Sequence, residues 1–181
     1  MNLVLERIKR TDPRILANMK VHYSQPKGFV GRNLCYAVLY NNIYYGSIVG
    51  GSATLHLPNR EEHTGKINLN NIINNTFYHI EKVNGQYPTR NFGEYVLKQF
   101  RERVSLDWKE RYGDDVIWFE SLVELPRSGE IYRRDNWLEI GVTKGFTCKR
   151  FGGESTDHWS GKRVWNTTEL RPKKVFLRKN E

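Results

Sequence analysis

The dipeptide His22-Tyr23 carries two side chains that could take part in proton transfer. It lies in a polar segment just before a basic, glycine-containing stretch, residues 27–32. Histidine serves as a general base near neutral pH, and a tyrosine can donate to a developing oxyanion or stack on a nucleobase. A single histidine in a loop is also common at the surface or in packing, so both roles stay open.

A second group of reactive side chains surrounds Glu124. Glu120 and Glu124 are four residues apart in a run that is typical of a strand, so their side chains point to one face. Glu124 falls where this strand ends, and ligands of open α/β sheets collect at such ends. Tyr132 and Asn136 follow at helical spacing, which predicts that both face Glu124, with Trp137 beside them. Glu120 could instead be buried and paired with an arginine.

A candidate anion site opens the longest predicted helix. Arg90, Asn91 and Gly93 stand where free backbone N–H groups and the helix dipole favour a negative charge. We expect these residues to contact the phosphates of a cofactor. The segment lacks the repeated glycines of a phosphate-binding loop, so an ordinary capped helix start is the alternative.

The charge of the chain favours a polyanionic partner. The chain has 29 Lys and Arg against 20 Asp and Glu, which gives a net charge of +9. Residues 144–181 are the most cationic stretch, and their basic residues alternate with aromatic ones, a pattern typical of nucleic-acid grooves. A solvated cationic edge strand is the alternative for this stretch. The candidate nucleic-acid contacts are Lys27, Arg32, Trp137, Lys149, Arg150, Lys162, Arg163, Lys173 and Lys174.

The sequence predicts no metal site, no disulfide and no membrane segment. Cys35 and Cys148 are far apart, and no histidines have the spacing of metal ligands. No apolar run approaches the roughly 20 residues that span a bilayer, and the first residues do not resemble a secretory signal. We therefore expect a cytoplasmic protein.

The pattern of apolar residues predicts a mixed sheet flanked by helices. Residues 34–40 and 43–49 form a predicted hairpin around Asn41-Asn42, and the double glycine after it predicts a bulge or the close approach of a ligand. The other predicted strands are 2–8, 67–80, 116–123 and 138–142, and the predicted helices are 13–19, 93–111 and 128–136. Residues 1–143 are expected to form the catalytic domain, and 144–181 a basic extension packed on it.

The segment Gly-x-Ile-Tyr-x-x-x-Asn-Trp, from Gly129 to Trp137, resembles the C-terminal half of the GNAT-like phage Mom proteins, which hypermodify adenine in DNA. It is also similar to the DruA-like proteins of anti-phage defence. In that family Asn74-Asn75, Trp108 and Arg111-Tyr112-Gly113 have counterparts. The similarity covers roughly residues 20–142.

The resemblance implies a GNAT-like fold, of class α+β, with His22, Tyr23, Glu124 and Tyr132 as catalytic residues. Glu124 replaces an aspartate of the Mom proteins, and Arg90 to Gly93 is a reduced form of the GNAT pyrophosphate loop. The implied activity transfers an acyl-type or glycyl-derived group, from acetyl-CoA or an aminoacyl-tRNA, to an exocyclic amine of DNA.

The resemblance further implies that this amine is adenine N6, modified by Mom-like carbamoylmethylation that protects phage DNA from restriction. A non-catalytic nucleic-acid-binding module of phage defence or counter-defence is the alternative. Acylation of a protein or a small amine is a third reading. The enzyme requires a pocket that joins His22, Glu124 and Tyr132, whereas the binding module does not.

Overall fold

The computed structural model describes residues 2–151, 162–166 and 170–180. For residues 147–151 and 162–166 it describes the backbone only. The strands are β1 (Leu3–Ile8), β2 (Asn33–Tyr40), β3 (Ile43–Ser52), β4 (Ile72–Ile80), β5 (Trp118–Glu124), β6 (Leu138–Val142), β7 (Thr147–Phe151), β8 (Lys162–Asn166) and β9 (Lys173–Lys179). The helices are α1 (Pro13–Val21), α2 (Arg60–Thr64), α3 (Phe92–Tyr112) and α4 (Glu130–Arg134), and Leu69–Asn71 form a 3₁₀ turn.

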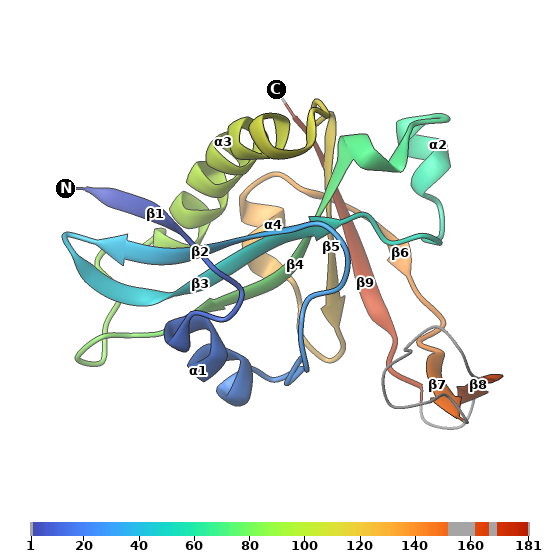
Figure 1. Ribbon diagram of the computed structural model, residues 1–181, viewed down its shortest axis with the longest axis horizontal. Coiled ribbons are helices and arrows are strands. Elements are labelled where there is room, and N and C mark those ends of the chain that lie inside the picture. The colour runs from blue at the N-terminus through green and yellow to red at the C-terminus, as the bar shows by residue number, and fades with distance from the viewer. Residues whose placement is uncertain (1, 152–161, 167–169, 181) are drawn as a thin grey trace.

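Seven strands form one mixed sheet in the order β1-β2-β3-β4-β5-β9-β6. The strands are antiparallel except for the parallel pair β4 and β5. Strand β9 lies between β5 and β6, so the end of the chain is paired on both sides. The edge-strand alternative is therefore wrong for residues 173–179. Strands β7 and β8 form a separate pair beyond the ends of β6 and β9 (Figure 1).

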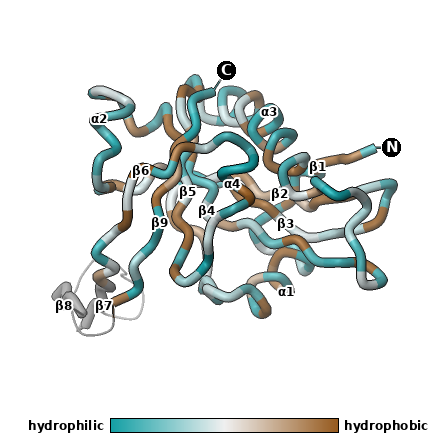
Figure 2. Tube along the Cα trace, turned by 180° about the vertical axis from the view of Figure 1, so that it is seen from behind, coloured by the Kyte–Doolittle hydropathy of each residue, from teal (hydrophilic) through white to brown (hydrophobic). Residues whose placement is uncertain are grey.

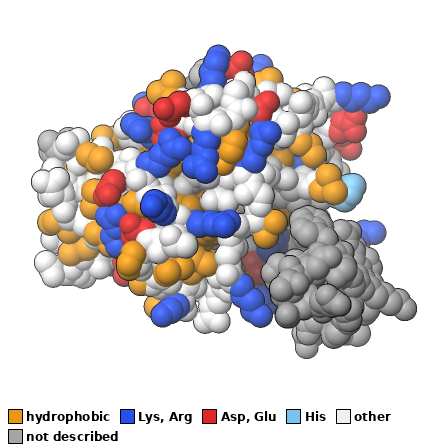
Figure 3. All heavy atoms as spheres, viewed as in Figure 1, with side chains coloured by type: hydrophobic (Ala, Val, Ile, Leu, Met, Phe, Trp, Pro, Cys, Tyr) orange, Lys and Arg blue, Asp and Glu red, His pale blue; other side chains and the backbone are white. Residues whose placement is uncertain are grey.

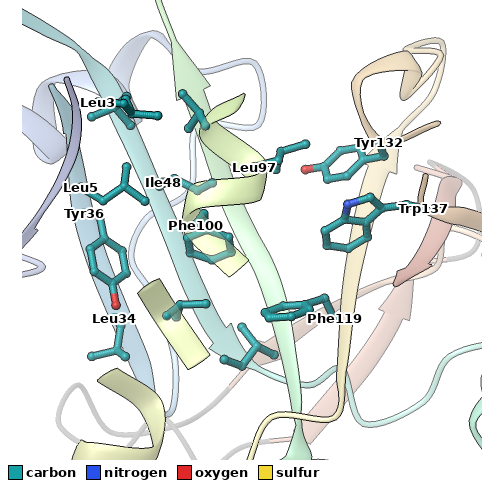
Figure 4. Close-up of a cluster of buried hydrophobic side chains, with 14 of the residues drawn as sticks. Leu3, Leu5, Leu34, Tyr36, Ile48, Leu97, Phe100, Phe119, Tyr132 and Trp137 are labelled. Carbon is teal, nitrogen blue, oxygen red and sulfur yellow. The ribbon is translucent and has the colours of Figure 1, made fainter. Parts of the chain in front are cut away.

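Helices cover both faces of the sheet (Figure 1). On one face α3 and α4 pack over a large core that includes Tyr36, Phe100 and Phe119 (Figure 4). On the other face α1 packs Ile15 and Met19 against a smaller cluster from β2, β3 and β4. Helix α2 is mostly hydrophilic and lies at the margin of the sheet (Figure 2). The layers match the mixed sheet flanked by helices that the sequence predicts.

The predicted elements are confirmed, apart from their ends. Helix α1 starts at Pro13 after the Asp12 cap, whose side chain accepts from the Arg14 N–H, and α3 ends before Gly113 in the left-handed conformation. Helix α4 is shorter than predicted and ends at Arg134. Asn136 lies beyond it with φ 58°, so the prediction that Asn136 shares a helix face with Tyr132 is wrong.

The double glycine coincides with a bulge between β3 and β4. The register shifts between Val49 and Gly50, which lies opposite Asn75. A Cβ atom on Gly50 would lie 3.0 Å from side-chain atoms of both Ile73 and Val104, so the glycine lets α3 pack closely on the sheet. The groups that come close to the Gly50 backbone are therefore core side chains. The bulge sets the register of β4 at Asn75.

Candidate functional site

The central opening of the sheet lies between β4 and β5. These strands pair only over Ile72–Asn74 and Trp118–Glu120 and diverge beyond that point. The diverging halves border a cavity of about 430 Å³, hereafter the strand-gap cavity. Its walls come from β4, β5, the segment after α1, and the segment from β5 into α4. A short parallel pairing therefore opens a pocket in the middle of the sheet.

The four predicted catalytic residues all border the strand-gap cavity. His22 and Tyr23 enter from the segment after α1, Glu124 from the end of β5 and Tyr132 from α4. The pocket that joins His22, Glu124 and Tyr132, which the enzyme reading requires, is present. The catalytic roles themselves stay predictions.

Tyr132 is buried, with its hydroxyl inside the gap between the strands. The ring stacks on Phe176 and packs against Trp137 (Figure 4). Its hydroxyl donates to Asn75 Oδ1 at 2.7 Å, and burial raises the pKa of Tyr132, so the hydroxyl stays protonated at neutral pH. Gly129 holds the start of α4 close to β9, since a Cβ there would lie 2.4 Å from Phe176.

His22 is held as a neutral ring. Burial, followed by the charge of His79, lowers the pKa of His22 to about 4. The Ser24 N–H donates to Nδ1 at 3.2 Å, and the Ser24 hydroxyl lies 2.8 Å from the same atom. The ring also bonds the backbone of Tyr78 and lies 4.6 Å from the Phe77 ring. These contacts hold the ring in the wall of the cavity, and the role of His22 in proton transfer stays a prediction.

Tyr23 links two walls of the cavity through its ring. The Arg127 guanidinium carbon lies 3.5 Å from the ring centroid, and the His22 ring packs at 4.2 Å. Arg127 belongs to the segment between β5 and α4, so this cation–π contact joins that segment to the one after α1. Burial raises the pKa of Tyr23, which keeps its hydroxyl protonated.

Glu124 stands where the strand-gap cavity meets a second, larger one. The second cavity measures about 1120 Å³ and shares Ser24, Leu122, Glu124 and Lys173 with the first. We call it the acceptor cavity. The Glu124 side chain is 18% exposed, and its carboxylate lies 3.9 Å from the Arg171 guanidinium. Glu124 is the one carboxylate among the described residues that borders both cavities.

A buried ion pair lies beside the acceptor cavity, which Arg60 lines. Glu120 is 0% exposed and accepts from the Thr54 N–H at 2.5 Å and from Arg60 Nη1 at 3.0 Å. Arg60 also donates to the carbonyls of Thr54 and Leu55, and so fixes the segment between β3 and α2. Burial raises the pKa of Glu120, while the Thr54 N–H and Arg60 lower it. The arginine partner considered for Glu120 is present.

Sequence reasoning did not identify Arg60 as this partner. Arg60 and Glu120 are sixty residues apart, and Arg60 belongs to none of the motifs found in the sequence. The only signal in the sequence was a charged residue, Glu120, inside an otherwise apolar strand, which requires a partner when buried.

Comparisons with known proteins address the fold. No family model and no curated protein matches the sequence. Among solved structures, an acetyltransferase from Bacillus subtilis in complex with CoA has a TM-score of 0.60 at 10% identity, covering 99% of this chain and 100% of that one. A GNAT acetyltransferase from Elizabethkingia anophelis with acetyl-CoA bound has a TM-score of 0.57 at 10% identity, covering 99% of each chain. The fold is that of the GNAT acetyltransferases.

A third similar structure is that of an enzyme whose acceptor is a polyamine. The spermidine/spermine N-acetyltransferase of Vibrio cholerae has a TM-score of 0.54 at 10% identity, covering 98% of this chain and 95% of that one. Identities this low establish the fold and leave the substrates open. The resemblance to the Mom-like and DruA-like families, which rests on the sequence motif, stays a prediction.

The predicted phosphate-binding residues lie beside a separate hollow of the GNAT fold. Arg90 and Asn91 line it together with Glu94 and Arg134, at the start of α3. Gly93 packs tightly against α4, because a Cβ there would lie 2.4 Å from Ile131, whose side chain lines the strand-gap cavity. The Gly93 carbonyl accepts a hydrogen bond from Tyr78. Cofactor binding by Arg90, Asn91 and Gly93 stays a prediction.

The predicted nucleic-acid contacts are placed differently from one another. Trp137 is 3% exposed, and its indole N–H donates to Asp135 at 2.7 Å, so the prediction that it stacks on a base is wrong. Lys27 is exposed, whereas Arg32 is paired with Asp114 and Lys174 lies 3.7 Å from Glu139. Lys173 borders both cavities. The side chains of Lys149, Arg150, Lys162 and Arg163 lie outside the described residues.

The described part of the chain contains no group of three or more His, Cys, Asp or Glu side chains that could hold a metal ion. Within the same residues, none of the helices has both the length and the apolar character needed to cross a membrane.

Proposed function

We propose that this protein is an N-acyltransferase in which Glu124 accepts the proton of an amine as the acyl group is transferred. The observation that carries the proposal is the position of Glu124 at the junction of two cavities. A donor in the strand-gap cavity and an amine in the acceptor cavity meet beside this carboxylate. Bringing two reactants together in this way supplies much of the rate enhancement of a bimolecular reaction.

The strand-gap cavity suits a thioester donor with an extended arm. Where β4 and β5 diverge, the backbone groups of the two strands no longer pair with each other, although the Ser121 hydroxyl still donates to the Asn75 carbonyl across the gap. An acylated chain with amide groups can bond to such edges as an added strand would. The solved structures with CoA and acetyl-CoA make acetyl-CoA the donor we propose to test first.

The chemical step follows from the residues at the junction. The amine nitrogen attacks the acyl carbon, the bond from that carbon to sulfur breaks, and the amine proton passes to Glu124. The leaving thiolate takes a proton from the Tyr132 hydroxyl, which is protonated at neutral pH and borders the same cavity. Positioned acid and base groups each contribute roughly 10²- to 10⁴-fold. His22 and Tyr23 hold the walls in place.

We further propose that the acceptor is an exocyclic amine of a DNA base, adenine N6 first. The acceptor cavity is lined by the cations Lys144, Arg171 and Lys173, by the carboxylates Glu61 and Glu124, and by the aromatic ring of Phe146, so that cations outnumber carboxylates among these side chains. Cations beside an aromatic surface favour a base on a phosphate backbone. They disfavour a polycation such as spermidine, because like charges repel. A base in a duplex would have to leave the stack to enter.

The nucleosides of bacteria that express the protein test this proposal. Total DNA is digested and analysed by mass spectrometry for a mass-shifted deoxyadenosine. We expect the modified nucleoside with the wild-type protein and its loss with Glu124→Gln. The matched control is Glu102→Gln, which removes an exposed carboxylate on α3 and should leave the product unchanged.

Two results would overturn different parts of the proposal. If DNA is unmodified while purified protein acetylates a protein or small amine with acetyl-CoA, the DNA acceptor is wrong and acyl transfer stands. If no acyl transfer occurs and neither acetyl-CoA nor CoA raises the melting temperature, acyl transfer from a CoA donor is wrong. An aminoacyl donor and the non-catalytic binding module would then be the remaining alternatives.

A further inference from the structure

A basic hollow lies at the opposite end of α1 from the strand-gap cavity. It measures about 780 Å³ and is lined by the end of β1, the turn after it, the start of β2 and the end of α3. Its cationic residues are Arg7, Lys9, Arg10 and Arg111, and the described residues that line it include no Asp or Glu. Figure 3 shows Lys and Arg side chains gathered along the lower border of α3 and over the strands beneath it.

Arg10 and Arg111 both line this hollow, from the turn after β1 and from the end of α3. Both act on the buried thiol of Cys35: burial raises the pKa of Cys35 to about 11, and the two positive charges lower it. Arg10 lies in a turn closed by a hydrogen bond from the Asp12 N–H to the Lys9 carbonyl.

Tyr112 anchors this arrangement. Its hydroxyl donates to the Asn33 carbonyl and accepts from the Asn33 N–H, at 3.2 and 3.1 Å. The guanidinium carbons of Arg32 and Arg111 lie 5.0 and 5.5 Å from its ring centroid. Cation–π contacts of this kind hold a cation in place without neutralising its charge.

The nearby acids leave the hollow positive. Asp114 pairs with Arg32, which is outside the lining, and Glu110 pairs with Arg7 at 3.4 Å. The Glu110 side chain is 73% exposed, and exposed pairs like this contribute little. Like charges held together without carboxylates repel each other, and an anion relieves that repulsion.

The hollow suits an extended polyanion better than a small ion. Lys9, Arg10 and Arg111 are exposed, and the hollow is open and far larger than one phosphate group. Helix α1 begins directly after the Arg10 turn and ends directly before His22. Its nine residues span about 14 Å at 1.5 Å per residue, which is less than one turn of B-DNA at roughly 34 Å. One duplex can therefore contact the hollow and reach the catalytic cavities.

We propose that the hollow formed by Lys9, Arg10 and Arg111 is a docking surface for the phosphate backbone of DNA, which holds the duplex while a base enters the acceptor cavity. The choice of DNA as partner rests on the proposed function. The contacts are made to phosphates, so they position the duplex and do not select a sequence.

Duplex binding at varied salt concentration tests the docking surface. The variant is Arg10→Gln/Arg111→Gln, and the matched control is Lys66→Gln/Lys98→Gln, which removes the same charge from exposed positions elsewhere. Fluorescence anisotropy of a labelled duplex is measured with each protein. The logarithm of the binding constant falls linearly with the logarithm of the salt concentration. Loss of two phosphate contacts should make this negative slope shallower by about 2, and should weaken binding roughly 10- to 30-fold at 0.15 M salt. The control should keep the wild-type slope.

Equal slopes for the two double variants would overturn the docking surface. So would inorganic phosphate, at constant ionic strength, displacing the labelled duplex as well as an unlabelled duplex does, because the hollow would then be a small-anion site. The nucleoside assay is independent of this measurement. If DNA is modified but the two double variants have equal slopes, only the docking surface is rejected. If Arg10→Gln/Arg111→Gln has the shallower slope but DNA is unmodified, only the DNA acceptor is rejected.

Discussion

The Tyr132 hydroxyl donates a 2.7 Å hydrogen bond to Asn75 Oδ1 across the gap between β4 and α4. The Asn75 amide nitrogen donates to the carbonyls of Val49 and Phe77, both at 3.2 Å, so the side chain is fixed in the sheet. The bulge at Gly50 sets the register of β4 at this residue. The hydroxyl oxygen of the proposed acid is thus fixed by the sheet before any ligand binds, and its proton must leave Asn75 Oδ1 to reach the thiolate.

Replacement Tyr132→Phe should lower both stability and activity. It leaves Asn75 Oδ1 buried without its donor, which costs about 1–3 kcal/mol in the free energy of unfolding. It also removes the proposed proton donor, so kcat should fall by roughly 10²-fold or more. Urea denaturation and steady-state kinetics measure the two effects.

The variant Asn75→Ala separates these two effects. It should lower stability while the Tyr132 hydroxyl remains present, and therefore reduce kcat less than Tyr132→Phe does. Equal kcat values for wild type and Tyr132→Phe would contradict the role of Tyr132 as acid.

Acid should destabilise the protein through His22. The pKa of His22 is about 4 in the folded protein and 6.5 in the unfolded chain, so between these values the unfolded state binds more protons. The stability that the neutral ring supplies is complete above pH 6.5 and is lost as the pH falls toward 4. The loss is on the order of 2 kcal/mol.

Urea denaturation at several pH values measures this loss. In His22→Asn the slope of stability against pH between 6.5 and 4 should be smaller than in the wild type. A slope that is unchanged in the variant would contradict the assignment to His22.

The sequence could predict the sheet through β6, helices α1, α3 and α4, and four residues that border one cavity. Apolar patterns mark each strand through β6, and Glu124 marks the candidate site because ligands of open α/β sheets collect at strand ends. It could not place β9, since the run from Lys173 to Lys179 has the composition of a basic tail and its partners are distant strands. Trp137 was misread because an aromatic residue in a basic chain suits a core and a nucleic-acid surface equally well.

The contact between Arg127 and the Tyr23 ring should support substrate binding. Tyr23→Leu and Arg127→Gln each remove the cation–π contact, worth about 0.5–2 kcal/mol, and loosen two walls of the strand-gap cavity. The KM for the donor should rise several-fold in each variant, with a smaller effect on kcat. The double variant should be no worse than either single one, because both remove the same contact.

Tyr23→Phe is the control for this contact, since it keeps the ring. Its KM should stay close to that of the wild type. A large rise in KM for Tyr23→Phe would show that the hydroxyl, not the ring, supports binding.

The buried pair of Arg60 and Glu120 should dominate the effect of charge changes on stability. Arg60→Met leaves the Glu120 carboxylate buried without its cation, which costs about 3–5 kcal/mol. The double variant Arg60→Met/Glu120→Met should recover much of this loss, because it leaves no unpaired charge in the core. A double-mutant cycle by urea denaturation gives the coupling energy.

The stability that Arg60→Met loses should also depend on pH. Burial already raises the pKa of Glu120, and loss of Arg60 raises it further. The folded protein then holds a proton that the unfolded chain releases above its ordinary pKa of about 4.5, so stability falls as the pH rises above that value. Arg60→Met should therefore be closer to the wild type at pH 5 than at pH 8. Equal destabilisation at both pH values would show that Glu120 is not left as an unpaired buried carboxylate.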